Sequence, residues 1–425
     1  MAQGSKVWVW QPGPRPSLRS QPMASLGSNW ARLKAQLPPG APRKRPAAEP
    51  SVPPKASKRA RRAARPTKAS LEQSIRLELG RWAVMDSVAE AYEASVEPVL
   101  GGAESGRGAQ KRKRHLEAWL WARRFHPLLP LGAPAKEAMV AGSAALARKL
   151  QNAGLRPKEA RLRVRRLAKL LRAPVAPEEG DVGVAEEERG GHAALTCGGR
   201  TVEVLPAYLA KLRKRCSPGV DFREAAFLML ARYRVLQVHD KGGGNQGAVP
   251  EAVFQTLERW AAQPVVEAFA SPLNALAAAG NYHSAFADVD TPFGSRGSFF
   301  EATFDEGVVE VNPPFDEDMV QRVADVCEAS LARAAAARRL LVFLVIVPET
   351  DWPGHAALLA SKFARWTRTL PAGQHFYQVG NQHVNSTRAY PASRNTTLLL
   401  LASRPVSGQG RLGDQIERAF RAQPS

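Results

Sequence analysis

The sequence contains few cysteines, no long apolar run and comparatively few acids. Its three cysteines lie far apart among 425 residues and form no Cys-x-x-Cys pair, which argues against a disulfide framework and a zinc knuckle. The longest apolar run, residues 340–347, is much shorter than the roughly 20 residues that cross a bilayer. The first residues lack the apolar stretch of a signal peptide, and the eight histidines never pair at metal-ligand spacing. We therefore expect no membrane span, no secretion and no bound metal.

The scarcity of acids leaves a strong positive charge. Lys and Arg total 60 against 39 Asp and Glu, which gives a formal net charge of +21. Residues 1–70 contain 15 basic side chains and one acid, and residues 107–172 contain 18 basic side chains and three acids. The rest of the chain is net acidic, so the positive charge is concentrated in two blocks. Such blocks predict a polyanionic partner, most often nucleic acid.

Residues 1–69 are predicted to form a disordered basic arm. They carry 12 of the 33 prolines and little apolar periodicity, so they cannot bury enough surface to offset the entropy of ordering. Two basic clusters, 43–45 and 58–62, flank a Pro- and Ala-rich spacer in the manner of a two-part nuclear localisation signal. On this basis we expect the nucleus, with a merely solubilising tail as the alternative. The tryptophans of the arm lack the tyrosine pair and the following proline of a WW domain, so none is predicted.

Residues 70–255 are predicted to form a mainly helical domain. A capping box at Ser70 opens an amphipathic pattern that should end before Pro98. In a later helix, Arg161 and Arg165 belong to a basic stripe opposite the apolar face, and either a solvated face or a contact with RNA or DNA explains it. Further helices are expected at 115–125, 134–151, 157–172, 206–215 and 222–238, with an acidic linker near 173–193.

Residues 256–405 alternate between strand and helix patterns, which indicates an α/β sheet covered on both faces. The apolar run 340–347 is typical of a fully buried strand. We predict a Rossmann-like domain here, followed by a C-terminal tail at 406–425. The expected strands are 265–270, 298–304, 308–311, 340–347 and 396–402, and the expected helices are 316–337 and 354–364.

The tetrapeptide Asn312-Pro313-Pro314-Phe315 follows one of these strands and precedes a helix with an acidic first turn. Sheets of this kind bind ligands at the carboxyl ends of their strands, so the tetrapeptide has the position of an active site. The residues suit methylation of an exocyclic amine such as adenine N6. The Asn312 side-chain carbonyl and the Pro313 backbone carbonyl can each accept one N6 hydrogen, and Phe315 can stack on the purine. A rigid strand-to-helix turn is the purely structural alternative.

A site for S-adenosylmethionine normally follows the first strand of such a sheet. The candidate segment, residues 265–274, has no Gly-x-Gly-x-Gly loop. The acids Asp288 and Asp290 and the turn 293–297 are further candidates for contacts to a ribose, an amino-acid group or a phosphate, with loop capping as the alternative.

Five segments occur in the following order: Phe269-Ala-Ser-Pro-Leu-Asn274, Ser284-Ala-Phe-Ala-Asp-Val-Asp290, Phe293-Gly-Ser-Arg-Gly297, Asn312-Pro-Pro-Phe315 and Gln382-His383. In this order they resemble the cap-specific adenosine N6-methyltransferase family, also called phosphorylated CTD-interacting factor. The resemblance implies a helical domain packed on a Rossmann-like class I methyltransferase domain, with S-adenosylmethionine as cofactor. It also implies methylation of N6 of the 2′-O-methyladenosine next to the 7-methylguanosine cap. Capped mRNA is thus the expected partner, and the transcription machinery is expected only through a WW domain that this sequence does not show.

The resemblance carries over residue by residue. The residues that match the catalytic tetrapeptide are Asn312, Pro313, Pro314 and Phe315. The residues assigned to the cofactor side are Phe269, Ser271, Pro272, Asn274, Asp288, Asp290, Ser295, Arg296 and Glu317. RNA contacts are predicted from charge and placement at Arg161, Arg165, Lys241, Gln246 and His383, and no residue is assigned to the cap guanine.

Two alternatives remain. The same chemistry could act on an internal adenine of RNA or DNA, since the tetrapeptide contacts the adenine amine and not the neighbouring cap. The second alternative is a nuclear RNA-binding protein with a catalytically retired methyltransferase fold. The intact tetrapeptide argues against it, whereas the missing Gly-rich loop argues for it.

Overall fold

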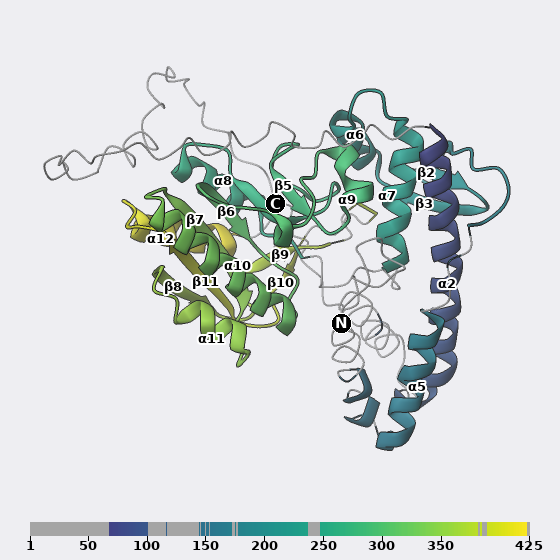
Figure 1. The fold of residues 1–425 in the computed structure, drawn as a ribbon, viewed down its shortest axis with the longest axis horizontal. Coiled ribbons are helices and arrows are strands. Elements are labelled where there is room, and N and C mark those ends of the chain that lie inside the picture. The colour runs from purple at the N-terminus through teal and green to yellow at the C-terminus, as the bar shows by residue number, and fades with distance from the viewer. Residues whose placement is uncertain are drawn as a thin grey trace, which may run out of the picture.

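The computed structural model describes residues 68–100, 154–171, 177–236, 247–380 and 389–422, with isolated positions between these ranges. The predicted basic arm and most of the two helices predicted between residues 115 and 151 lie outside the described residues. Figure 1 shows a helical part beside a part that contains the main sheet.

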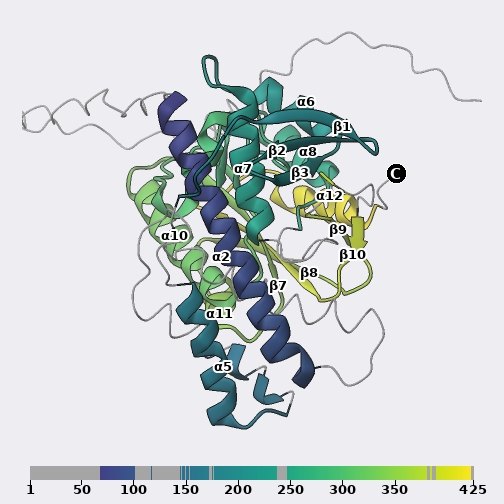
Figure 2. The ribbon, with the colours of Figure 1, turned by 90° about the vertical axis from the view of Figure 1, so that its right-hand side faces the viewer.

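The helical part is built on one long helix, α2, which packs against α7 and α5 (Figures 1 and 2). Leu71, Ile75 and Leu79 of α2 are buried because their spacing places them on one helix face. A small antiparallel sheet, in the order β1-β2-β3, lies against α7. The elements are α2 (Lys68–Leu100), α5 (Pro157–Leu170), α6 (Pro206–Arg215), α7 (Phe222–Leu236), β1 (Ala185–Arg189), β2 (His192–Cys197) and β3 (Arg200–Val204).

The structure differs from the sequence predictions at two places in this part. α2 begins at Lys68 and continues through Pro98 to Leu100, so Ser70 does not cap it. Pro98 lies in the last turn, where the missing N–H forfeits one backbone hydrogen bond and does not break the helix body. The stretch predicted as a linker contains β1, which pairs with β2. All five β1 residues are exposed, so no apolar alternation marks the strand in the sequence.

The other part is organised around a six-stranded mixed sheet in the order β5-β4-β6-β7-β11-β8. β4 is parallel to β5 and β6, and β6 is parallel to β7, whereas β11 is antiparallel to both of its neighbours. The chain therefore has a mixed α/β fold. The strands are β4 (Val266–Ala270), β5 (Tyr282–Ser284), β6 (Gly307–Val311), β7 (Leu341–Pro348), β8 (Ala364–Leu370) and β11 (Thr396–Ala402), beside a separate pair, β9 (Phe376–Gln378) and β10 (Ala389–Pro391).

Helices cover both faces of this sheet. Leu344 and Ile346 of β7 cluster with core residues of α8 and α12, whereas Phe343 and Val345 cluster with core residues of α10 and α11. Alternate residues of one strand thus face two different cores, as the uninterrupted apolar run predicts. The helices are α8 (Glu251–Ala261), α9 (Ala287–Asp290), α10 (Glu317–Ala336), α11 (Pro353–Leu359) and α12 (Gln409–Arg421), with short 3-10 turns η2 (Thr291–Phe293) and η3 (Phe299–Glu301).

Most elements predicted in this part are confirmed within a few residues, and the strand predicted at 298–304 is wrong. This segment contains η3, which is capped where Ser298 accepts a hydrogen bond from the Phe300 N–H. The predicted tail, 406–425, contains α12, whose Leu412 and other apolar residues complete one core. The domain boundary predicted at 255/256 falls inside α8.

A third apolar core includes residues of both parts. Leu273, Phe286 and Phe293, from loops beside the sheet, cluster with Phe227 and Tyr233 of α7. In the described ranges, no helix is long and apolar enough to cross a membrane. Within the same ranges, no group of three or more His, Cys, Asp or Glu side chains is arranged to hold a metal ion.

Candidate active site

The sheet has a topological switch point at β4. The chain passes from β4 to β5 on one side and then forms β6 on the other side. Ligands of open α/β sheets bind outside the carboxyl ends of the strands at such a point. Glu267 of β4 lies opposite Glu310 of β6, so the carboxyl ends of the two strands are level. Asn312 therefore follows β6 at the edge where residues 269–274 leave β4.

Asn312 is 7% exposed and is held in one orientation. Its Nδ2 donates a hydrogen bond to the Gly247 carbonyl oxygen at 3.0 Å. Only the amide nitrogen can donate to a carbonyl, so this bond fixes which end of the side chain is which. Oδ1 is buried and has no hydrogen-bond partner among the described residues. An unpaired buried acceptor costs about 1–3 kcal/mol, so this oxygen is suited to accept a hydrogen from a ligand.

Gly247, which sequence analysis did not find, is fixed by the neighbouring backbone. Ala248 donates to the Gln378 carbonyl at 3.1 Å and accepts from the Gln378 N–H at 2.8 Å. This bridge joins the segment before α8 to β9, which pairs with β10. A backbone carbonyl leaves no side-chain signal in a sequence, so only the structure shows the contact.

The rest of the tetrapeptide is also ordered by its surroundings. The Phe315 ring is partly buried and meets the Tyr377 ring edge-on, with 5.8 Å between centroids. The Asp316 N–H donates to the Pro314 carbonyl at 2.9 Å, and the Asp316 carboxylate then caps α10. Pro313 is buried. The tetrapeptide is therefore a rigid strand-to-helix turn, and this turn presents Asn312 and Phe315 at the switch point.

The segment after β4 closes on itself without glycine. Both the N–H and the hydroxyl of Ser271 donate to Asn274 Oδ1, at 2.6 and 2.9 Å. Pro272 is buried between them in the turn. Phe269, at the end of β4, is half-buried and packs against the Phe299 ring at 5.0 Å. The predicted cofactor residues of this segment thus lie together at the carboxyl end of β4, the strand next to β6.

Two buried acids lie below the switch point, and sequence analysis missed both. Glu267 and Glu310 are only 3% and 1% exposed and lie opposite each other on neighbouring strands. Burial raises the pKa of Glu267 to about 7. Burial and the adjacent Glu267 raise the pKa of Glu310 well above its usual range. Because two adjacent buried carboxyls repel each other when both are charged, the pair retains a proton at neutral pH.

The structure engages Asp288 and Asp290 with α7. Arg232 of α7 contacts Asp288 at 3.1 Å and forms a buried ion pair with Glu78 at 2.6 Å. The Tyr233 hydroxyl donates to Asp290 at 2.8 Å. Asp290 is fully buried, which raises its pKa to about 7, whereas the Asp288 side chain is 40% exposed. Asp288 is therefore the one of these two acids that a ligand can reach.

Other predicted cofactor residues are not brought together. Ser295 is buried, and its hydroxyl hydrogen-bonds that of Ser284 at 2.6 Å. Arg296 donates to Asn281 at 3.0 Å, and Glu317 is exposed at the start of α10. Ser295 thus has the contacts of a residue that fixes the turn beside β5.

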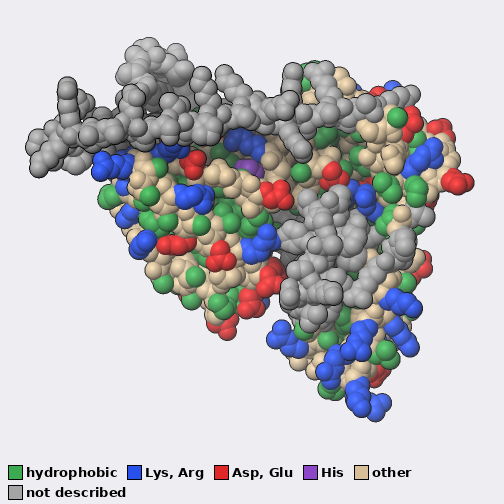
Figure 3. Space-filling model, viewed as in Figure 1, with side chains coloured by type: hydrophobic (Ala, Val, Ile, Leu, Met, Phe, Trp, Pro, Cys, Tyr) green, Lys and Arg blue, Asp and Glu red, His purple; other side chains and the backbone are tan. Residues whose placement is uncertain are grey.

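The predicted RNA contacts are spread over the molecule. Arg161 and Arg165 are exposed on α5, and Figure 3 shows basic side chains gathered over this helix at the lower right. His383 is 5% exposed, and burial lowers its pKa to about 4, so it is neutral at physiological pH. Lys241 and Gln246 lie outside the described residues.

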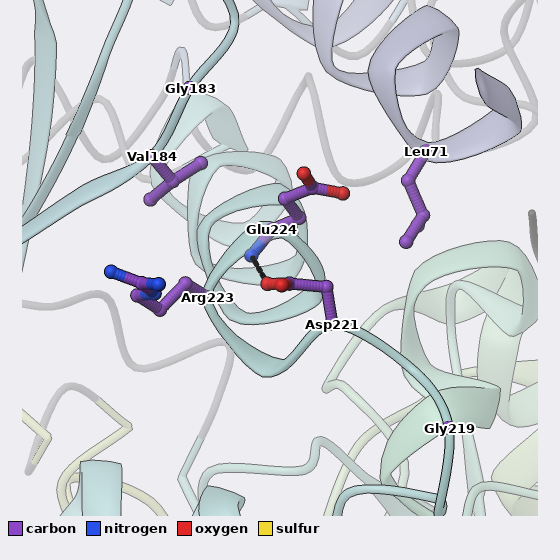
Figure 4. A pocket seen from close by; sticks show the side chains of 7 residues that line it. All are labelled: Leu71, Gly183, Val184, Gly219, Asp221, Arg223 and Glu224. Carbon is purple, nitrogen blue, oxygen red and sulfur yellow. Dashed lines mark hydrogen bonds between the residues drawn. The ribbon is translucent and has the colours of Figure 1, made fainter. Parts of the chain in front are cut away.

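A pocket of about 450 Å³ lies away from these residues (Figure 4). It opens between the start of α2, the segment before β1 and the start of α7. Asp221 caps α7 in its wall by accepting from the Glu224 N–H at 3.1 Å. None of its lining residues follows β4 or β6, so it is separate from the switch point. The lining consists of Leu71, Gly183, Val184, Gly219, Asp221, Arg223 and Glu224.

Comparison with known proteins agrees with the family resemblance that the motifs indicate. Residues 210–380 match the family model described as phosphorylated CTD interacting factor 1 WW domain. The family resemblance is confirmed. The matched segment runs from α6 into the region after β9 and contains both the segment 265–274 and the tetrapeptide 312–315. The tryptophans of the arm, on which the expectation of no WW domain rests, lie outside the described residues.

Two curated proteins similar to this chain carry the name mRNA (2'-O-methyladenosine-N(6)-)-methyltransferase. The mouse protein is 34% identical over 231 residues, which cover 52% of this chain and 32% of the relative. The human protein is 33% identical over 218 residues, which cover 49% of this chain and 30% of the relative. The chain thus matches about a third of the length of these relatives.

Proposed function

We propose that this protein is an S-adenosylmethionine-dependent mRNA methyltransferase that methylates N6 of the cap-adjacent (2′-O-methyl)adenosine. The observation that carries the proposal is Oδ1 of Asn312 at the carboxyl end of β6, which is buried and has no hydrogen-bond partner among the described residues. An adenine amino group carries two hydrogens and is the kind of donor that this oxygen lacks. The names of the two relatives support the choice of substrate.

The topology supports a Rossmann-like class I methyltransferase domain. Five strands run in one direction, and β11 alone is inserted antiparallel, between β7 and β8. The residues at the end of β4 fit a cofactor with an aromatic ring and polar groups. Phe269 offers a half-buried ring, the turn at Asn274 offers polar atoms, and Asp288 offers a half-exposed carboxylate that suits ribose hydroxyls.

In this proposal, the side chains orient a weak nucleophile. Bound S-adenosylmethionine would supply an electrophilic methyl group. Asn312 Oδ1 and the Pro313 carbonyl accept the two N6 hydrogens, which draws the nitrogen lone pair out of the ring and towards the methyl group. Phe315 holds the base by stacking. The N6 proton is released to water after transfer, so the site needs orientation more than a strong general base.

Stacking by Phe315 predicts a defined kinetic change. In Phe315→Ala, we expect KM for the RNA to rise about 10-fold, because base stacking on an aromatic side chain contributes about 1–3 kcal/mol. Phe315→Tyr keeps the ring and should retain a KM near that of the wild type. Steady-state methyl transfer at varied RNA concentration measures both. An unchanged KM in the alanine variant would exclude the stacking role.

The exposed basic face of α5 predicts a change in salt dependence. In Arg161→Gln/Arg165→Gln, we expect weaker RNA binding and a slope of log affinity against log salt reduced by about 1.4, since each contact with single-stranded RNA contributes about 0.7. Turnover at saturating RNA should be retained. The matched control is Arg411→Gln/Arg418→Gln on α12, whose side chains are also exposed. If log affinity fell with log salt equally steeply in the two double variants, α5 would not be part of the RNA interface.

The nucleus remains the proposed compartment and capped mRNA the proposed partner. The compartment rests on the basic clusters of the arm, and the partner rests on the names of the relatives.

Equilibrium binding of radiolabelled S-adenosylmethionine tests the cofactor directly. Saturable binding supports the proposal, and no binding by folded protein would favour an RNA-binding protein without activity.

A further inference from the structure

Helix α6 reaches from the helical part to the loop that follows β4. The Lys211 ammonium donates to the Leu273 carbonyl at 2.8 Å. The Arg215 guanidinium donates to the carbonyls of Ala275 and Ala277, at 3.0 and 2.9 Å. Two cations one helical turn apart therefore hold three backbone carbonyls of one short loop.

The same loop is held from below by Glu267 of β4. Its Oε2 accepts the N–H groups of Leu276 and Ala277, at 2.7 and 3.0 Å. Burial raises the pKa of Glu267, whereas these two backbone hydrogen bonds and, to a smaller extent, the charges of Lys211 and Arg215 lower it. Lys211, Arg215 and Glu267 thus all form hydrogen bonds with the backbone of this one loop.

The loop after β4 differs from the glycine-rich loops of nucleotide-binding sheets. A Gly-rich loop lets the backbone turn tightly and come close to a ligand. Residues 265–274 contain no glycine, and side chains of α6 and β4 hold the backbone that follows β4. The turn formed by Ser271 and Asn274 leads directly into the residues that α6 holds.

The start of α6 is attached to the segment that contains His383, a predicted RNA contact. The N–H of Leu205, which precedes α6, donates to the His383 carbonyl at 2.7 Å. One ten-residue helix therefore joins the His383 segment to the loop after β4.

We propose that Lys211 and Arg215 are positioning residues that hold the loop after β4 in the shape that binds S-adenosylmethionine. This inference rests on the proposed function. Neither residue needs to touch the cofactor. They replace the conformational role of a Gly-rich loop with charged hydrogen bonds from a neighbouring helix.

Lys211 gives the proposal a pH signature. Burial, and then the nearby Arg215, lower the pKa of Lys211 to about 8, against the attraction of Glu267 and Glu251. The Tyr208 ring lies 5.9 Å from its ammonium. The charged form is therefore present below about pH 8 and is lost above it. A neutral amine donates a weaker hydrogen bond, so the hold on the loop weakens as pH rises.

The test compares Lys211→Met, Lys211→Arg and Lys214→Met in the full-length chain. Lys214 is exposed on the same helix and serves as the matched control. We expect Kd for S-adenosylmethionine to rise about 10-fold in Lys211→Met, in line with loss of a charged hydrogen bond, and to remain near wild type in the other two. Kd for a short capped RNA should not change. Circular dichroism and Tm verify folding, and Arg215→Lys gives a second, milder variant.

The pH arm separates positioning from simple packing. Between about pH 7 and about pH 9.5, the affinity of the wild type for S-adenosylmethionine should fall more than that of Lys211→Arg, because a guanidinium stays charged, whereas titration of the cofactor's own α-amino group is common to both proteins. Equal Kd values in wild type and Lys211→Met, or parallel pH profiles in wild type and Lys211→Arg, would overturn this inference alone. No binding by the wild type would overturn the proposed function and this inference with it.

Discussion

Replacing Asn312 by alanine is expected to lower kcat about 10²-fold, as loss of one oriented hydrogen-bonding group does in other active sites. The side chain is buried, and its Oδ1 has no partner among the described residues, so the alanine variant leaves one of the two N6 hydrogens without an acceptor. Kd for S-adenosylmethionine should change little. Single-turnover methyl transfer with saturating RNA and cofactor measures the chemical step.

Asn312→Asp separates the two ends of the amide. Aspartate keeps an acceptor but loses the donor that holds the Gly247 carbonyl, and it places negative charge beside that carbonyl. We expect turnover to fall in this variant as well. If Asn312→Ala kept wild-type turnover, Asn312 would be a structural residue of the turn and the catalytic assignment would be wrong.

Replacing Arg232 by methionine is expected to destabilise the folded protein by about 3 kcal/mol, the low end for breaking a buried ion pair, because the Glu78 carboxylate then keeps only Arg81 as a charged partner. Arg232 and Glu78 are 1% and 0% exposed, and three hydrogen bonds of 2.6–2.8 Å join them. Arg232 also contacts Asp288 beside the sheet. Its loss therefore loosens the contact between the helical part and α9. A fall in Tm and in the denaturant midpoint measures the effect.

The double variant Arg232→Met/Glu78→Met is the control for this prediction. Removing both charges leaves no fully buried ion, although Arg81, whose side chain is 13% exposed, also loses its carboxylate, so part of the lost stability should return. Kd for S-adenosylmethionine in this double variant then reports whether the ion pair serves only folding. A single variant as stable as the wild type would contradict the buried-charge argument.

Much of the fold could be predicted because several elements carry a local signal. The run 340–347 is apolar at every position, so it predicts a strand with two covered faces, and β7 is entirely buried. α10 follows an Asp cap at Asp316, and its helical pattern is long. α5 has a clean apolar face, with Val164 and Leu167 buried. These elements need no distant partner to be recognised.

Other elements depend on partners that a linear pattern does not show. β8 alternates poorly between buried and exposed residues and is defined by its pairing with β11. In the segment predicted as a strand at 298–304, Phe299 and Phe304 pack against each other at 5.2 Å, which favours a compact turn over an extended strand.

The position of the candidate site could be predicted, but the contacts that orient its residues could not. Asn312 was found because it follows a strand and precedes a helix. The Gly247 carbonyl that orients it lies 65 residues away, and Lys211 lies 62 residues from the carbonyl that it holds. The sequence suggests Asp290 as a ligand-binding acid, yet its carboxylate accepts a hydrogen bond from the Tyr233 hydroxyl of α7. Such contacts follow from the packing of the two parts.

The most direct test of the central claim is methyl transfer from labelled S-adenosylmethionine to short RNAs that begin with adenosine, with and without a 7-methylguanosine cap. Nucleoside analysis then identifies the methylated position. The account predicts N6-methylated adenosine on the capped RNA only. Label on both RNAs would retain the enzyme and remove the cap from its specificity, and label on neither, with folded protein, would contradict the account.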